Sequence, residues 1–144
     1  MDVRDRIGNT ALIRATQGGH TAIATALVAA GAELDSQSNT GHTALACAAS
    51  DGHTAIVAAL ITAGAAVDIQ TAKGSTALIL AANKGNTDVV TALIAAGAAV
   101  NIQCAKGHTA LSRAIRHGHT AIGTALIVAG ATSRGGRRIC PALP

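Results

Sequence analysis

The segment GHTALACAASDGHTAIVAALI, residues 41–61, decides the fold, because most of the chain is built from versions of it. The glycine that opens the segment recurs every 33 residues, at Gly8, Gly41, Gly74 and Gly107. The threonine two residues later and the leucine two residues after that keep the same spacing, and so does a second glycine near the middle of the segment. A fixed period of this length indicates a protein assembled from stacked copies of one small structural unit.

Each copy contains two apolar stretches with helical spacing. Leu45, Ala48 and Ala49 fall on one face of a first helix. Ile56 and Leu60 fall on one face of a second. Helices of about nine or ten residues are marginal in isolation, because nucleation is costly and few hydrogen bonds follow it. The two helices of a copy are therefore expected to pack against each other and against neighbouring copies.

Threonine and glycine mark the expected ends of these helices. Thr43 and Thr54 are predicted N-caps, whose hydroxyls accept a hydrogen bond from an unpaired amide of the first turn. Gly52 is predicted to end the first helix in a left-handed conformation. Equivalent caps are predicted at Thr10, Thr21, Thr76, Thr87, Thr109 and Thr120. Between copies, AVDIQTAKGST (residues 66–76) predicts an extended arm or loose hairpin with Gly74 at its tip.

The repeated pattern G-x-T-A-L-x-x-A-x-x-x-G-H-T-A-I-x-x-A-L-I-x-A-G-A-x-V-(N/D) resembles the ankyrin repeat, a unit of 33 residues with the signature T-P-L-H-x-A. The resemblance implies an all-α fold, an ankyrin-repeat solenoid of stacked helix-turn-helix units joined by β-turn or hairpin arms. It predicts four repeats, at residues 2–34, 35–67, 68–100 and 101–131. Residues 132–144 break the repeat pattern and contain Gly, Arg and Pro, so they are predicted to form a flexible basic tail. The signature histidine is replaced by Ile13, Ala46, Ile79 and Ser112. We expect this loss to weaken the hydrogen bonding between loops.

Positions that stand 33 residues apart form a column of equivalent residues, and three residues differ from the other members of their columns. Arg14 and Arg113 occupy a column that is otherwise apolar, with Cys47 and Leu80 in the middle copies. One of these arginines can be exposed at an end of the stack, so the other is expected to extend its guanidinium to the edge. Gly123 lies inside the last helix and costs roughly 0.5–1 kcal/mol relative to alanine. The fourth repeat is therefore predicted to be the least stable.

The overall composition favours an intracellular protein without a membrane span. At 144 residues the chain has the length of one ordinary domain, and 49% of it is hydrophobic. Its uncharged stretches are shorter than the roughly 18 apolar residues of a membrane helix, and MDVRDRIGNT at the start lacks the apolar region of a secretion signal. Three cysteines without CxxC spacing suit reduced thiols. We expect a cytoplasmic location, with the nucleus left open.

Residues that resemble catalytic or metal-binding groups have simpler structural explanations. Cys47 lies on the inward side of its helix, where a free cysteine acts as a small buried hydrophobe. A column of polar side chains precedes the second helices, formed by His20, His53, Asn86 and His119. Its members are separated by the helix-to-helix distance of about 8–10 Å, whereas zinc needs its ligands at about 2.0–2.3 Å. This column is predicted to order the turns between helices.

One cluster leaves a metal or thiol site open. Cys104, His108, His117 and His119 could approach one another where the last arm meets the last inter-helix turn. Their residue types suit zinc or a thiol and base pair, but their spacing matches no ligand motif. The sequence contains no phosphate loop, nucleophile elbow or HExxH helix. We therefore expect no enzyme activity, no metal and no cofactor.

The resemblance implies a non-catalytic protein-protein interaction module. Ankyrin-like proteins hold protein partners on a concave face formed by the arm tips and the first helices. At the arm tips the matching positions are Arg6, Ile7, Asn9, Asn39, Thr40, His42, Ala72, Lys73, Ser75, Ala105, Lys106 and His108. At the ends of the first helices they are Gln17, Ser50, Asp51, Asn83, Lys84, Arg116 and His117. These positions vary between copies while the scaffold columns do not, as expected of a surface that selects a partner.

The charge distribution favours an acidic protein partner. Residues 89–144 contain six basic residues and no acidic one, whereas residues 1–88 contain five basic and seven acidic residues, so +6 and −2 sum to the net charge of +4. A basic half suits an acidic protein face or, as the competing hypothesis, a nucleic acid or another polyanion. The chain has no Trp, Tyr or Phe to stack on bases, which favours the protein. It also predicts a modest affinity spread over many contacts.

Overall fold

The computed structural model describes residues 10–130, which form eight α-helices and no β-strand. The helices are α1 (Ala11–Gln17), α2 (Thr21–Ala29), α3 (Ala44–Asp51), α4 (Thr54–Thr62), α5 (Ala77–Lys84), α6 (Thr87–Ala95), α7 (Ala110–Arg116) and α8 (Thr120–Val128). The all-α prediction is confirmed for this range. None of these eight helices has the length and hydrophobicity needed to traverse a bilayer.

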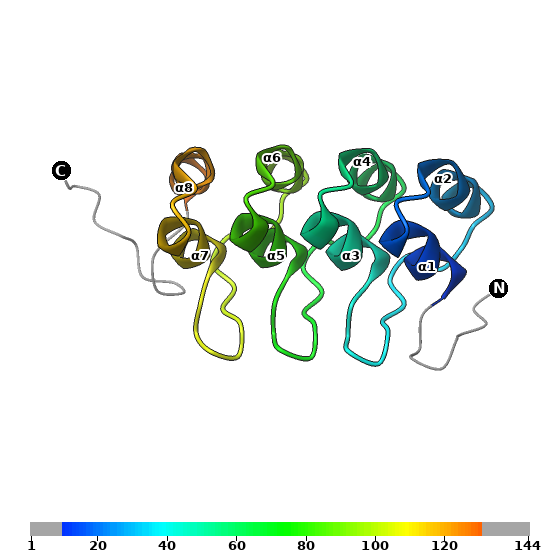
Figure 1. Ribbon diagram of the computed structural model, residues 1–144, viewed down its shortest axis with the longest axis horizontal. Helices are drawn as coiled ribbons and strands as arrows, with labels where there is room; N and C mark the ends of the chain where they lie inside the picture. The colour runs from blue at the N-terminus through cyan, green and yellow to red at the C-terminus, as the bar shows by residue number, and fades with distance from the viewer. Residues whose placement is uncertain (1–9, 131–144) are drawn as a thin grey trace.

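The helices form helix-turn-helix pairs that stack side by side into a solenoid (Figure 1). The first helices α1, α3, α5 and α7 make one row, and the second helices α2, α4, α6 and α8 make the other. Three loops project from the first row, away from the second, and we call them the first, second and third arm: residues 30–43, 63–76 and 96–109. Each helix contacts its counterpart in the neighbouring pair, which is the support that helices this short require.

Threonine caps the first helix of each pair, as predicted. Thr43 has an extended backbone, and its Oγ1 accepts a hydrogen bond from the amide N of Ala46 at 3.1 Å. The same capping bond is formed by Thr10, Thr76 and Thr109. These threonines are almost fully buried, so their caps satisfy amides that water does not reach. Gly52 ends α3 in the left-handed conformation, with φ of +76°, which is also as predicted.

The predicted caps of the second helices are wrong. The threonines expected to cap them are instead the first helical residues: Thr21, Thr54, Thr87 and Thr120. The N-cap positions belong to the preceding residues, whose side chains form no capping bond. The cause is the short turn, because only Gly52 and His53 separate α3 from α4. The chain has therefore already entered the helix at Thr54, which is exposed to solvent.

The first helices are buried on nearly all sides, and the second helices on one face. In α3, Ala44 to Ala49 are all buried, because α1, α4 and α5 surround this helix. α4 buries Ile56, Val57 and Leu60, while residues on its other face are exposed. Alanine suits the first row because small side chains let neighbouring helices pack closely without voids. The resulting core runs along the whole stack.

The residues that break the columns lie in the first and last described pairs. Arg14 of α1 is exposed, and Arg113 of α7 is half-buried beside the third arm, as expected for one exposed arginine and one that reaches the edge. Gly123 is buried within α8. The low stability of the fourth repeat and the repeat boundaries stay predictions, and residues 2–9 and the tail at 132–144 lie outside the described residues.

Candidate binding surface

Each arm is closed into a tight loop by the same two backbone hydrogen bonds. In the second arm, the amide N of Thr71 donates to the carbonyl O of Ser75 at 2.9 Å, and the amide N of Gly74 donates to the carbonyl O of Thr71 at 2.8 Å. Gly74 has a φ of +80° and lies at the turn, which confirms the predicted hairpin-like arm. The first and third arms carry the equivalent bonds at Ser38 and Cys104.

Neighbouring arms are also joined to one another. The amide N of Ala72 donates to the carbonyl O of Thr40 at 3.0 Å, and the amide N of Ala105 donates to the carbonyl O of Lys73 at 2.8 Å. A Cβ atom on Gly74 would lie only 2.7 Å from the amide N of Ala105, so this contact requires glycine. The three arms therefore present their side chains from one connected framework.

A column of glutamines, which the sequence analysis missed, strengthens this framework. The Nε2 of Gln70 donates to the carbonyl O of Gly74 at 2.8 Å within its own arm and to the carbonyl O of Gln103 at 3.3 Å in the next arm. Gln37 forms the same two bonds one repeat earlier. The signal was present in the sequence, because Gln37, Gln70 and Gln103 stand 33 residues apart.

The predicted binding positions that the structure describes are all accessible to solvent. Arg6, Ile7 and Asn9 lie outside the described residues. Five of the other positions are half-buried, namely His42, Ser50, Ser75, Asn83 and His108. The remaining positions are exposed: Gln17, Asn39, Thr40, Asp51, Ala72, Lys73, Lys84, Ala105, Lys106, Arg116 and His117. None of the described positions belongs to the buried core, so each is available for contact with another molecule.

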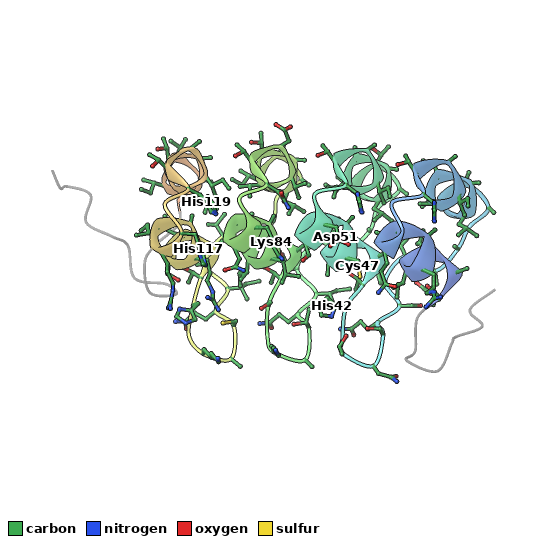
Figure 2. All side chains as sticks on the ribbon, viewed as in Figure 1. His42, Cys47, Asp51, Lys84, His117 and His119 are labelled. Carbon is green, nitrogen blue, oxygen red and sulfur yellow. The ribbon has the colours of Figure 1, made fainter. Side chains whose placement is uncertain are left out.

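These positions follow two lines along the stack. One line runs along the arms, on which His42 lies, and the other crosses the ends of the first helices, where Asp51, Lys84 and His117 follow one another (Figure 2). The character of the second line changes along the stack, since Asp51 is acidic and Lys84 is basic. Beyond Asp88 the described chain contains no acidic residue at all. The surface is therefore mixed near its middle and basic toward α7.

Some of these side chains are paired within the molecule, and others are open. The Oγ1 of Thr40 and the Nδ1 of His42 lie 2.9 Å apart, and the carboxylate of Asp51 lies 4.0 Å from the Nε2 of His53. Four cations of the surface form no salt bridge with any residue between 10 and 130: Lys73, Lys84, Lys106 and Arg116. The basic part of the surface is therefore open to an anion from outside.

A cavity lies between the second and third arms. The cavity between the arms has a volume of about 290 Å³ and is lined by Lys73, Ser75, Cys104, Ala105, Lys106 and Arg113. Arg113 was not among the predicted binding residues, because its column is apolar in the middle repeats. Partial burial and the charges of Arg113, Arg116 and Lys106 lower the pKa of His108 beside this cavity. Positive charge is thus concentrated around the third arm.

The polar column before the second helices orders the turns, as predicted, and it does so across repeats. The Nδ2 of Asn86 donates to the carbonyl O of Ala49 at 2.8 Å, and so satisfies a carbonyl near the end of α3 in the preceding pair. The ring of His119 lies against Gly85 of the preceding pair, where a Cβ atom would come within 2.7 Å of it. These side chains therefore belong to the scaffold.

The buried cysteine is poorly suited to nucleophilic chemistry. Cys47 is 6% exposed, as predicted for a small core residue. Burial and then the charge of Asp51 raise the pKa of its thiol to about 11, although a side-chain hydrogen bond with Gln17 acts in the opposite direction. Because the thiolate is the nucleophile, this thiol is almost entirely in its unreactive form at neutral pH.

The cysteine and histidine cluster near the third arm does not form a metal site. Cys104 and His108 are joined through their backbones, with the amide N of Cys104 donating to the carbonyl O of His108 at 2.9 Å. The rings of His117 and His119 stack with their centroids 6.0 Å apart. Between residues 10 and 130, no group of three His, Cys, Asp or Glu side chains is placed to hold a metal ion.

Comparison with known protein families matches residues 1–71 and 49–133 to the family described as ankyrin repeats (3 copies). The two matched ranges overlap and together span most of the chain. The chain belongs to the ankyrin-repeat family. Its helix pairs and arms are therefore ankyrin repeats, so the family resemblance and the fold expected from the sequence are confirmed. A comparison with curated proteins found no match.

Ankyrin repeats are generally protein-protein interaction modules, and the family is generally non-catalytic. The described part of this ankyrin-repeat chain agrees with that general role. It combines accessible polar side chains on a connected framework with a cysteine whose thiol stays protonated.

Proposed function

We propose that this chain is a non-catalytic adaptor that binds an acidic surface of a protein partner along its arms and the ends of its first helices. The observation that carries the proposal is the open set of cations on a connected framework. Lys73, Lys106 and Arg116 are exposed and form no salt bridge with residues 10–130. Hydrogen bonds between the arms hold the backbone that carries two of them.

The energetics suit a reversible interaction. Exposed ion pairs contribute roughly 0.2–1 kcal/mol each and are screened by salt, so several must act together. The chain has no aromatic residue to anchor a partner. Charge complementarity then sets specificity and the association rate more than the affinity. We expect moderate binding that weakens as the salt concentration rises.

The test compares two variants that lower the net charge by the same amount. In the surface variant, glutamine replaces Lys73, Lys106 and Arg116. In the control variant, glutamate replaces Ala22, Ala55 and Ala121, which are exposed in the second row. Asp88 already occupies the equivalent position of α6, near a helix N-terminus that favours an acidic residue. The control is therefore expected to fold normally.

Proteins captured by the immobilised full chain are identified and quantified by mass spectrometry for the natural sequence and both variants. The proposal expects the surface variant to lose the specifically captured proteins, and expects the control to keep them. Equal capture by all three chains would show that the proposed surface does not bind the partner. Equal loss in both variants would show that total charge, and not this surface, controls binding.

A nucleic acid or another polyanion is the competing ligand of the same cations. Labelled RNA and DNA are titrated at two salt concentrations, because binding to a phosphate backbone weakens steeply with salt. Salt-dependent binding that the surface variant abolishes would favour this alternative over a protein partner.

A cytoplasmic location completes the proposal. It is supported by Cys47 and Cys104, which are free thiols in the described chain. A fluorescent fusion of the full chain tests it, and accumulation in a secretory compartment would contradict it.

A further inference from the structure

Three cations from three different segments converge on the cavity between the second and third arms. Lys73 comes from the second arm, Lys106 from the third arm and Arg113 from α7, and Ser75 adds a hydroxyl group. The cavity has a volume of about 290 Å³. This volume is at the lower end of the roughly 300–1,000 Å³ range of small-molecule pockets, so the cavity has room for a small group such as the end of a side chain.

Backbone hydrogen bonds hold these segments in fixed relative positions. The amide N of Ala105 donates to the carbonyl O of Lys73 at 2.8 Å and joins the two arms beside the cavity. The amide N of Cys104 donates to the carbonyl O of His108 at 2.9 Å and closes the third arm next to α7. A site whose framework is already ordered loses little conformational entropy when a ligand binds.

The position of Arg113 is unusual for an arginine. Its equivalents in the middle pairs are Cys47, which is buried, and Leu80, which is half-buried. The Arg113 guanidinium takes part in no hydrogen bond or salt bridge with residues 10–130, although the residue is half-buried. Removing part of a charge from water without a partner costs free energy. An outside anion would supply the partner that the chain itself does not provide.

The electrostatics around the third arm point to the same conclusion. Partial burial and the charges of Arg113, Arg116 and Lys106 lower the pKa of His108. No acidic residue follows Asp88 in the sequence to offset these cations. A bound anion would reduce the repulsion, so the pKa of His108 is expected to rise when the cavity is occupied.

A phosphate monoester matches this cavity better than a carboxylate. It carries about −1.5 to −2 charges at neutral pH and has three strong acceptor oxygens, which three cations and one hydroxyl can engage together. Arginine binds phosphate through two parallel hydrogen bonds, and lysine binds it as a point charge. A carboxylate offers a single charge and would leave the remaining cations without compensation.

We infer that this cavity, which we call the phosphate site (Lys73, Ser75, Lys106 and Arg113), binds the phosphate group of a phosphorylated serine or threonine in a partner protein. The inference rests on the proposed function, because it names the group that the partner presents. It also gives the adaptor a means of regulation, since phosphorylation of the partner would switch this contact on.

The test is an NMR titration of the uniformly ¹⁵N-labelled full chain with N-acetyl-phosphoserine amide. We expect saturable shifts of the backbone amides of Ala105 and Lys106 and a higher pKa of His108 at saturation. N-acetyl-glutamate amide and a dinucleotide with one phosphodiester serve as comparison probes, and each is expected to bind at least about tenfold more weakly. Equal binding of all three probes, or shifts spread evenly over the chain, would overturn the assignment.

Two variants localise the effect. Arg113→Leu places in α7 the residue that α5 carries at the equivalent position, so it is expected to fold, and to reduce phosphoserine affinity at least about tenfold. Ala55→Glu lowers the net charge by the same amount at an exposed position of α4, outside both the cavity and the proposed binding surface, and is expected to change the affinity less than about twofold. Similar losses of phosphoserine affinity in the two variants would show that the probe responds to overall charge, and would contradict the assignment of the phosphate site.

The phosphate site and the proposed function can fail separately. If the surface variant loses its captured proteins but the natural chain binds no phosphoserine, the adaptor function stands and the phosphate site is wrong. If phosphoserine binds and Arg113→Leu abolishes its binding, but capture is unchanged in the surface variant, the cavity binds a phosphate group, while the proposed binding surface and the phosphorylated protein partner are both wrong.

Discussion

Replacing Gly123 with alanine is expected to stabilise the protein. Gly123 lies inside α8, it is buried, and its backbone does not have the positive φ that would require glycine. A Cβ atom added there would meet only the Cδ1 of Leu111 at 3.9 Å, which is an ordinary van der Waals contact. The equivalent residues of the other second helices are Ala24, Val57 and Val90, so the position accepts a side chain.

Two contributions determine the size of the gain. Alanine in a helix interior is favoured over glycine by roughly 0.5–1 kcal/mol. A fully buried methyl group adds up to about 0.8 kcal/mol, but Gly123 and Leu111 border a groove of about 280 Å³ at the end of the described stack, so part of this is lost to solvent. We expect a total of about 1–1.5 kcal/mol, which corresponds to a rise in Tm of roughly 3–6 °C for a domain of this size.

Thermal and urea unfolding followed by circular dichroism measure this change, and hydrogen exchange shows whether α7 and α8 gain the protection. The matched control is Gly74→Ala, because Gly74 has a φ of +80° and a Cβ atom there would lie 2.7 Å from the amide N of Ala105. That variant is expected to lose about 1–2 kcal/mol or more. A neutral or destabilising Gly123→Ala would refute the view that this glycine is a local weakness of the last pair.

Three further predictions concern other parts of the scaffold. Thr43→Ala is expected to lower the free energy of unfolding by about 1–2 kcal/mol in urea denaturation, and Thr54→Ala by less than about 0.5 kcal/mol, because only the former is an N-cap. Asp68→Ala is expected to cost about 1 kcal/mol in the same assay, since its Oδ1 accepts a hydrogen bond from the amide N of Ala99 at 2.9 Å. Cys47 is expected to react slowly with iodoacetamide at neutral pH in the folded protein and quickly in urea, as peptide mapping would show. The pKa of the Cys47 thiol is about 11 in the folded protein, against an ordinary value of 9.0. The protonated thiol therefore contributes fully to the free energy of unfolding below pH 9.0, and this contribution is lost as the pH rises toward 11.

The scaffold could be predicted from the sequence because each of its features is repeated. Leu45 and Leu78 recur in one column with the same burial, so periodicity alone identified them as core. It was harder to predict which of the two threonines of a repeat caps a helix. Thr43 and Thr54 have the same residue type and both precede an apolar stretch, but a two-residue turn places one before its helix and the other inside it. A shift of one residue decides that outcome, and such shifts are the least predictable part of a helix.

The candidate surface was predictable only as a set of accessible positions. Lys73 and Lys106 could be placed on the arms from the repeat, and both are exposed there. Contacts between repeats could not be placed, because they depend on the distance between pairs. The bonds from Gln70 to two arms and the cavity beside Arg113 both arise from that distance. Sequence columns indicate which residues are equivalent, but they do not show which of them touch.

The two arginines of one column show why an irregular residue can have different meanings at different places. Cys47 in this column is buried, and the side chain of Gln17 in the preceding pair acts to lower the pKa of its thiol, so the column faces backwards along the stack. Among residues 10–130, Arg14 has no preceding pair to face, and its exposure is sufficient explanation. Arg113 does have one, because α5 packs against α7.

Arg113 is therefore expected to lower the stability of the folded chain. We infer that an arginine occupies this position because it binds a ligand. The variant Arg113→Leu should then be more stable than the natural chain, by about 1 kcal/mol, because an apolar side chain replaces a half-buried charge without a partner. Urea unfolding in the absence of phosphate measures this difference. Saturating phosphoserine should narrow the gap, since it stabilises only the chain that binds it. If Arg113→Leu proves less stable, the arginine is part of the packing of α7, and its position no longer argues for an anion.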